Sequence, residues 1–392
     1  AVLDALGQGN GITGNFGKLE VTDSTSGNIT YKSGKHGQMT INGILIGAFS
    51  TTNIHTLAVS AGAGSTVGAG ASSVTTVESA RTQAIINEGA RINRESGRNG
   101  GQAAVYVVAS GDSVESVSGG SAGISGSTGI SGCVVVYTGK KYTEASIRSG
   151  ANVFAEKEIV VLAHTDNQLY ATAVGVAGSG STAAGATVSV IYLKDETTAS
   201  AGGTLEGASI TVQAEADEQL VMSVMSAAVS GSTAAGASVG TIVFKGITRA
   251  IVLPGAHLTA ANGGIKVSAQ SNEKVNLTVA GAAGSGSASV AGSFAILIMN
   301  VTTQSMVQGS NAAAKGSLTA AGSVEISAAD KTEFDLIVGG ASFGGSAAVG
   351  AAIGTTVYRN TVTAMIGNYN VVTGRNIRVT AVADRNIRSS AV

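Results

Sequence analysis

Six aspartate and asparagine residues recur along the chain at nearly constant spacing, and their side chains are the first candidates for chemistry. Carboxylate oxygens at equivalent positions of a repeat suit Ca²⁺, which makes Asp166 and Asp217 weak calcium candidates. The glycine-rich nonapeptide of calcium-binding β-rolls is absent from the sequence. We therefore assign no metal site and expect a structural ladder of polar turns. Its members are 54, 51, 55, 58 and 54 residues apart: Asp112, Asp166, Asp217, Asn272, Asp330 and Asp384.

Two glycine-rich strings match enzyme motifs by letter alone. Residues 9–14 (GNGITG) fit the dinucleotide pattern G-x-G-x-x-G, and residues 119–123 (GGSAG) fit the nucleophile elbow G-x-S-x-G. The first motif needs a strand-to-helix context and an acidic residue about 20 positions further on, where only Asp23 is near. The second needs a strand-to-helix turn and a histidine partner. With 56 glycines in 392 residues such strings arise freely, so we assign neither site.

The histidines and the cysteine carry no recognisable site. The spacing typical of zinc ligands is absent, and we expect each histidine to lie at the surface or in a turn. Cys133 is the one cysteine of the chain, so no internal disulfide can form. We predict no catalytic, cofactor-binding or metal-binding residues and no cofactor. The four histidines are His36, His55, His164 and His257.

The densest charged patch comprises Lys140, Lys141, Tyr142 and Glu144, which we interpret as a solvated corner. A β-helix polysaccharide lyase or hydrolase gathers acids, cations and aromatic residues in one groove. Aromatic residues make up only 4% of this chain, and it has no tryptophan to stack on a sugar ring. We therefore predict that the protein is not an enzyme and keep this enzyme class as a distant alternative.

The composition of the chain argues against several other classes of protein. Only 12% of residues are charged and the mean hydropathy is +0.30, which argues against solvated disorder. A net charge of −1 offers no basic surface for nucleic acid. No uninterrupted run of 18 apolar residues occurs, so we expect no membrane insertion. The chain opens at Ala1 without an initiating methionine, and we expect a processed chain or a segment of a longer one.

The sequence repeats with a period of about 54 residues. The clearest register is apolar-x-apolar-x-Ala, as in Ile159-x-Val161-x-Ala163, followed three residues later by the Asp or Asn, or two residues later in the case of Asp330. Alternation with period two, β-branched residues and turn clusters predict strands throughout. We therefore predict an all-β, repetitive β-solenoid of about six to seven repeats over residues 41–392. Residues 1–40 are expected to be an irregular, capping or partial repeat, and each repeat is either one wide rung or two narrow ones.

Some strands are apolar on both faces. In residues 173–177 (AVGVA) one face carries Val174 and Val176, and the other carries only alanine and glycine. Strands of this kind are buried on both faces. The small-residue face is therefore covered either by another layer of the same coil, which we favour, or by another copy of the protein.

Two types of sequence block alternate over roughly residues 40–390, one of the type AVGVAGSGSTAAGATVSVIYL and the other of the type GASITVQAEADEQ. This style resembles the passenger regions of large bacterial surface exoproteins, namely filamentous-haemagglutinin-like and leukotoxin-like adhesins exported by autotransporter or two-partner secretion. The resemblance implies a right-handed parallel β-helix, an extracellular location and an adhesive or scaffolding role. It supplies no catalytic residues. The 392 residues depart from that class in containing neither its N-terminal export domain nor its C-terminal membrane barrel.

These observations lead to two expected functions. The first is an extracellular, structural and adhesive stalk or filament on a bacterial cell surface. The second is a self-assembling subunit of an extracellular fibre that packs through faces of alanine, glycine and serine. Expected partners are further copies of the chain and a ligand on a host or neighbouring cell.

Overall fold

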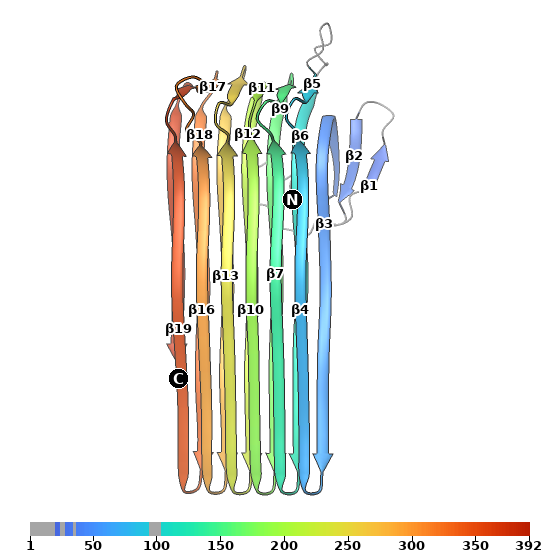
Figure 1. Ribbon diagram of the computed structural model, residues 1–392, viewed down its shortest axis with the longest axis vertical. Coiled ribbons are helices and arrows are strands. Elements are labelled where there is room, and N and C mark those ends of the chain that lie inside the picture. The colour runs from blue at the N-terminus through green and yellow to red at the C-terminus, as the bar shows by residue number, and fades with distance from the viewer. Residues whose placement is uncertain (1–19, 24–27, 34–36, 94–102) are drawn as a thin grey trace.

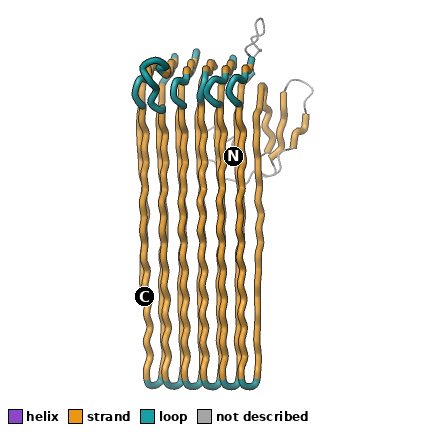
Figure 2. Tube along the Cα trace, in the orientation of Figure 1, coloured by secondary structure: helices purple, strands orange, loops and turns teal. Residues whose placement is uncertain are grey.

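The structure is a computed structural model that describes residues 20–23, 28–33, 37–93 and 103–392. Within these ranges the chain forms strands joined by turns, and no helix occurs (Figure 2). The strands stack into parallel ladders that repeat once per sequence repeat. This confirms the expected all-β solenoid.

Each repeat forms one wide coil. In the third coil, β9 (Glu158–Ser179) runs out, the chain turns at Gly180 and Ser181, and β10 (Thr182–Ala201) runs back. The short strand β11 (Thr204–Gly207) then closes the coil at the opposite end (Figure 1). We call the end with the Gly/Ser turns the tip and the end with the short strands the base.

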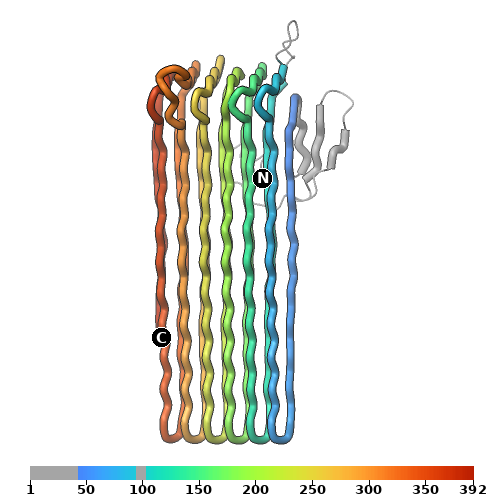
Figure 3. The backbone as a smooth tube through the Cα atoms, viewed as in Figure 1, coloured from blue at the N-terminus to red at the C-terminus, as the bar shows by residue number. Residues whose placement is uncertain are grey.

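The other coils repeat this arrangement, and the colours in Figure 3 pass in order across the stack because each coil lies beside its neighbours in sequence. The remaining strands are β1 (Glu20–Asp23), β2 (Asn28–Ser33), β3 (Gly37–Gly64), β4 (Val67–Ile86), β5 (Arg91–Ile92), β6 (Ala104–Ser125), β7 (Thr128–Ile147), β8 (Asn152–Phe154), β12 (Ser209–Ser230), β13 (Thr233–Val252), β14 (His257–Ala260), β15 (Ile265–Ser285), β16 (Ala288–Val307), β17 (Gly316–Ala320), β18 (Val324–Gly344), β19 (Ala347–Ile366), β20 (Asn370–Thr373) and β21 (Ile377–Ala391).

The strands form three sheets. The outgoing sheet contains β3, β6, β9, β12, β15, β18 and β21, the returning sheet runs from β4 to β19, and the base sheet runs from β5 to β20. Neighbouring coils pair in parallel with equivalent residues in register, so Ile159 pairs with Ile210 and Val161 with Val212. Because every repeat adds one strand to each sheet, a repeat is one wide rung.

The array is longer along its strands than along the coil axis. Six steps of about 4.8 Å separate β3 from β21, or about 30 Å along the coil axis. A strand of 22 residues such as β9 extends about 70 Å at about 3.3 Å per residue. The molecule is therefore a flat blade whose long axis follows the strands (Figure 1).

The expected leading segment, residues 1–40, lies partly outside the described residues. Its described part contains β1 and β2, which pair antiparallel with each other, and β2 pairs antiparallel with the start of β3. The array itself begins with β3.

The interior of the blade has four zones from base to tip. An apolar cluster at the base includes Val161 and Leu205, and a second apolar cluster further along includes Leu169 and Ile191. A layer of polar and charged side chains separates these two clusters. At the tip the interior contains only small side chains, with an alanine cluster formed by Ala177, Ala183, Ala228, Ala234, Ala283 and Ala291.

Small residues let the two long sheets approach closely at the tip. A Cβ added to Gly236 would lie 2.4 Å from the carbonyl oxygen of Ala282 in the opposite sheet, which is closer than atoms can pack. The face of β9 that carries Ala173 and Ala177 is buried against the returning sheet, while Val176 points outward and is 43% exposed. The small-residue face is thus covered by a layer of the same coil, as favoured from the sequence.

We expect Gly236→Ala to lower the free energy of unfolding by about 1–3 kcal/mol, because the new methyl group forces the sheets apart. The control is Gly292→Ala, since Gly292 points outward and a Cβ there would meet no atom within 4 Å. Urea unfolding midpoints measure both. Equal midpoints for the two variants would show that the sheets are not held this close.

Candidate functional site

The aspartate ladder lies within straight strands, so the predicted turns are wrong. Asp112, Asp166, Asp217 and Asn272 pair successively in register on the outward side of the outgoing sheet. Each lies well inside its strand. The sequence resembles a turn at this point because outward-facing and inward-facing residues are both polar. Asp166, for example, lies between the buried residues Thr165 and Asn167.

The ladder also changes its members in the later coils. Asn272 pairs with Lys331, and Lys331 pairs with Asp384. Asp330 is one residue out of this column and is only 2% exposed, because it points into the blade. Five of the six predicted ladder residues therefore share one outward column, and Asp330 belongs to the interior.

The two calcium candidates lie side by side. Asn272 Nδ2 donates a hydrogen bond of 3.0 Å to Asp217 Oδ1. Burial and the neighbouring Asp166 raise the pKa of Asp217 to about 6, although the Asn272 hydrogen bond lowers it, and burial also raises the pKa of Asp166. Across the described residues no group of three or more His, Cys, Asp and Glu side chains is arranged to hold a metal ion. The pair supplies at most four of the six to eight oxygen ligands that Ca²⁺ takes.

The histidines do not converge. His55 and His257 are exposed, and His36 and the string at residues 9–14 lie outside the described residues. His164 is fully buried, so the expectation of a surface or turn position is wrong for it. Burial lowers the pKa of His164 to about 3. Gly119 and Ser121 of the elbow-like string lie inside β6, where no strand-to-helix turn exists.

The charged patch at Lys140 and Lys141 is not a solvated corner. Both residues lie in the middle of β7, where successive side chains point to opposite faces. Lys140 is exposed, whereas Lys141 is only 8% exposed and points inward. Lys141 is the centre of a buried polar layer that we regard as the candidate functional site.

The polar layer crosses the interior between the two apolar clusters. It is built from inward positions of both long sheets in consecutive coils, so in-register pairing sets its geometry. Its members are all buried or nearly so, apart from Asn360 and Tyr358 in the last complete coil, which are partly exposed. Its principal residues are Glu78, Ser113, Glu115, Lys141, Asn167, Asp195, Glu218, Ser271, Glu273, Asp330, Thr332, Tyr358 and Asn360.

Lys141 joins the first part of the layer. Its Nζ lies 2.6 Å from Glu115 Oε1, 3.4 Å from Glu78 Oε2 and 3.1 Å from Asn167 Oδ1. It also donates to Ser113 Oγ. The carboxylates raise the pKa of Lys141 against the opposing effect of burial, so this ammonium stays charged.

The pKa values of Glu78 and Glu115 are shifted in opposite directions. Burial and hydrogen bonding with Glu115 together raise the pKa of Glu78 to about 7, against the lowering effect of the Lys141 charge. For Glu115, burial is outweighed by hydrogen bonding with Glu78 and by the charge of Lys141, so its pKa is lowered. Tyr137 donates a 2.8 Å hydrogen bond to Glu78 Oε2. Lys141 therefore pairs with ionised Glu115, while Glu78 gains its proton near neutral pH.

Asn167 links Lys141 to the next coils. Its amide nitrogen donates to Asp195 and, at 3.0 Å, to Glu218 Oε1. Burial raises the pKa of Asp195, against the Lys141 charge. Burial and the charge of Asp195 raise the pKa of Glu218 well above its usual value.

A second acid pair continues the layer toward β19. Thr332 Oγ1 lies 3.2 Å from Glu273 Oε2 and 3.1 Å from Asp330 Oδ1, so its single hydroxyl proton can be donated to either carboxyl group. Asn360 donates to Asp330, and Tyr358 donates to Thr332 Oγ1 at 2.9 Å. Burial, reinforced by the charge of Asp330, raises the pKa of Glu273 well above its usual value.

A column of threonines borders the layer on the base side. These residues pair in register on the inward side of the returning sheet. Two of them reach across the interior, with Ser50 Oγ 2.5 Å from Thr82 Oγ1 and Thr165 Oγ1 2.6 Å from Thr197 Oγ1. The column consists of Thr82, Thr143, Thr197, Thr248 and Thr303.

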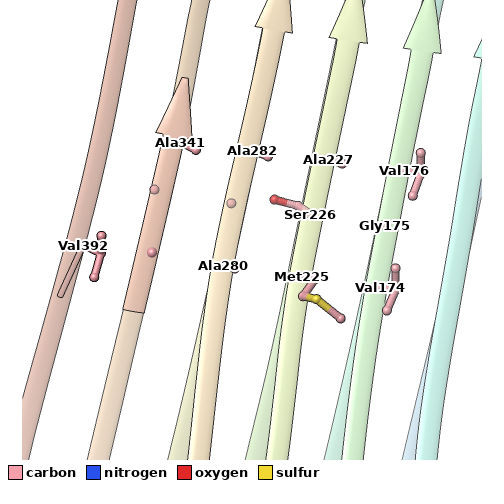
Figure 4. Close-up of a pocket in the computed structure, with 13 residues that line it drawn as sticks. Val174, Gly175, Val176, Met225, Ser226, Ala227, Ala280, Ala282, Ala341 and Val392 are labelled. Carbon is pink, nitrogen blue, oxygen red and sulfur yellow. The ribbon is translucent and has the colours of Figure 1, made fainter. Parts of the chain in front are cut away.

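The part of the layer around Lys141 can hold protons but has no room for a substrate, whereas a groove of about 440 Å³ is lined in part by Ser271 and Asp330 of the later coils. The cavity beside Lys141 has a volume of about 10 Å³, which is about the space of one water molecule. A larger groove of about 530 Å³ lies on the outward side of the outgoing sheet, where Ala280, Ala282 and Ala341 succeed the larger Val174 and Met225 (Figure 4). That groove has an almost wholly apolar lining, so it offers no group for acid–base chemistry.

Comparison with protein-family models, curated proteins and solved structures finds no significant match to this chain. No helix able to cross a membrane occurs in the described residues.

Proposed function

We propose that this protein is an extracellular, structural and adhesive β-solenoid that forms a rigid stalk or filament on a bacterial cell surface. The observation that carries the proposal is the unbroken run of in-register coils, in which every long strand between β3 and β19 pairs with its equivalents. A repeat array contacts only its neighbours and extends by adding coils, which suits a scaffold. The style of the repeat, which resembles large bacterial surface exoproteins, supports the location.

The buried polar layer supports the same role. Its members lie between two apolar clusters and hydrogen-bond from coil to coil, as Asn167 does with Glu218 of the next coil. Buried polar networks can fix a unique register, because a slip of one residue would leave each group without its partner. We propose that the layer sets the coil register and is not a catalytic centre.

A second candidate function is a self-assembling fibre subunit. Strand β19 forms the edge of the returning sheet, and β21 forms the edge of the outgoing sheet. Such edges are templates for another strand of either the same or a different chain. The array would then continue through coils supplied by further copies.

Adhesion measurements test the proposal. Cells that display the protein are compared with isogenic cells lacking it for retention on host-cell, neighbouring-cell and inert surfaces under flow. We expect a several-fold loss of retention on at least one surface. Unchanged retention on all of them would refute the adhesive role. Electron microscopy of the isolated protein before and after strong dilution separates the two candidates, because filaments that survive dilution favour the fibre subunit.

A further inference from the structure

The outward side of the returning sheet is uncharged over its whole tip half. Six outward positions in each of its six strands, from β4 to β19, lack any charged side chain. In β4 these are Val67, Ala69, Ala71, Ser73, Thr75 and Val77, and the other strands contribute the residues paired with them. We call this surface the uncharged face; it is the near side of the blade in Figure 1.

The uncharged face exposes large apolar side chains. Val77 is 74% exposed, Val349 is 57% exposed and Ile353 is 54% exposed. With strands about 4.8 Å apart and outward residues about 6.6 Å apart, the face covers about 1,100 Å². This area exceeds the roughly 800 Å² that one partner contributes to a stable interface.

A basic column borders the face on the base side. Lys140, Lys194, Lys245 and Arg359 occupy one outward column, with Asn300 between the last two. Two copies packed face to face with their tips in the same direction would set these columns against each other. With the tips in opposite directions, the uncharged faces overlap and each basic column lies at the solvated rim, which is the usual arrangement of a stable interface.

We propose that the uncharged face binds the same face of a second copy, with the two tips pointing in opposite directions. The interface area and the placement of the basic columns support this partner. The inference deepens the proposed structural function and rests on it, since it names the surface by which neighbouring blades associate laterally. It is distinct from edge-to-edge growth through β19 and β21.

A lipid surface fits the face less well. The long strands end in open sheet edges at β19, and backbone groups of open edges are not tolerated in hydrocarbon. The flat face of another blade leaves those edges in water. Vesicle binding and self-association distinguish the two partners by experiment.

Sedimentation velocity of the purified chain between about 1 and about 100 µM, a range that spans micromolar dissociation constants, measures the association. We expect dimers. The variant Ala186→Glu/Ala237→Lys places an opposite-charge pair at the centre of the face, on neighbouring residues that are exposed and in register. The two charges form an ion pair across the neighbouring strands, so the variant monomer can fold. In the dimer the ion pair would be buried, so the dimer dissociation constant should rise at least about tenfold.

The matched control is Ser223→Glu/Thr278→Lys, an in-register pair on the outward side of the outgoing sheet. It should leave dimerisation unchanged. The variant Ala184→Glu/Ala235→Lys, one outward position nearer the tip, repeats the test if the first variant folds poorly. Circular dichroism and urea midpoints confirm folding of each.

Three results would overturn the inference. The first is a wild-type chain that stays monomeric throughout the range. The second is equal weakening by the control pair. The third is binding of monomers to phosphatidylcholine vesicles that Ala186→Glu/Ala237→Lys abolishes, which would assign the face to a lipid surface. None of these results affects the retention of cells that display the protein, so they test the inference independently of the proposed function.

Discussion

Urea unfolding of this protein should have a higher midpoint at pH 5 than at pH 8. Glu78, Asp195, Glu218 and Glu273 have folded-state pKa values raised by burial. Because the pKa of each group is higher in the folded state, folding takes up a proton. The resulting stabilisation is complete below the pKa of the unfolded state and is lost as pH rises through the pKa of the folded state. For Glu78 this window runs from 4.5 to about 7. Each unit of pKa difference is about 1.4 kcal/mol, so Glu78 alone loses on the order of 3 kcal/mol across this window, and the other three groups change stability in the same direction.

Other groups oppose this trend more weakly. The lowered pKa of Glu115 makes its contribution complete above 4.5 and reduces it as pH falls. The pKa of His164, lowered to about 3, likewise removes stability as pH falls below 6.5. Asp217, with a pKa of about 6, acts in the same direction as the four buried carboxyls. We therefore expect the maximum of stability near pH 5, with a decline on the acid side.

The variant Glu218→Gln/Glu273→Gln should flatten the dependence between pH 5 and pH 8, because two protonated carboxyls are replaced by neutral amides of the same shape. Glu156→Gln is the control, since Glu156 is exposed. Urea midpoints over this pH range measure all three proteins. An unchanged slope in the double variant, or a wild-type midpoint that rises toward pH 8, would contradict the proton-holding layer.

Lys141→Met should be the most damaging single substitution in the layer. It removes the cation that lies 2.6 Å from Glu115 and 3.4 Å from Glu78 and leaves both carboxyls buried without it. Loss of one member of a buried ion pair costs about 3–5 kcal/mol. We expect this cost at pH 8 and a smaller cost at pH 5, where Glu78 is protonated.

The neighbouring residue supplies the control. Lys140→Met changes the same residue type in the same strand but on the exposed face, where the effect should stay within about 0.5 kcal/mol. Adding Glu115→Gln to Lys141→Met should recover much of the loss, because the buried negative charge disappears with its partner. If Lys141→Met is no worse than Lys140→Met, then Lys141 does not hold the layer together.

Much of the fold followed from period and composition. Alternation such as Ile159-x-Val161-x-Ala163 and the regular spacing of the repeat predicted stacked parallel strands, and the Gly/Ser turns marked the tip correctly. The number of rungs per repeat could not be derived, because a polar stretch in mid-strand has the composition of a turn. At Asp166 the outward side chain and its inward neighbours are polar together, so alternation disappears locally although the strand continues.

The polar layer was missed for the same reason, although a signal for it existed. Continuing in steps of two beyond Ala163 gives Thr165, Asn167 and then Leu169, which are consecutive inward positions. The threonine column of the returning sheet repeats in the same way. The distances that make Lys141 and its carboxyls a cluster depend on the facing of two sheets, which no single-strand pattern contains.

Immuno-electron microscopy of cells that make the protein tests the structural claim most directly. We expect label outside the cell, on extended stalks or filaments whose width is close to the roughly 70 Å strand length of the blade. Label confined to the cell interior, or to compact particles with no extension from the surface, would contradict it.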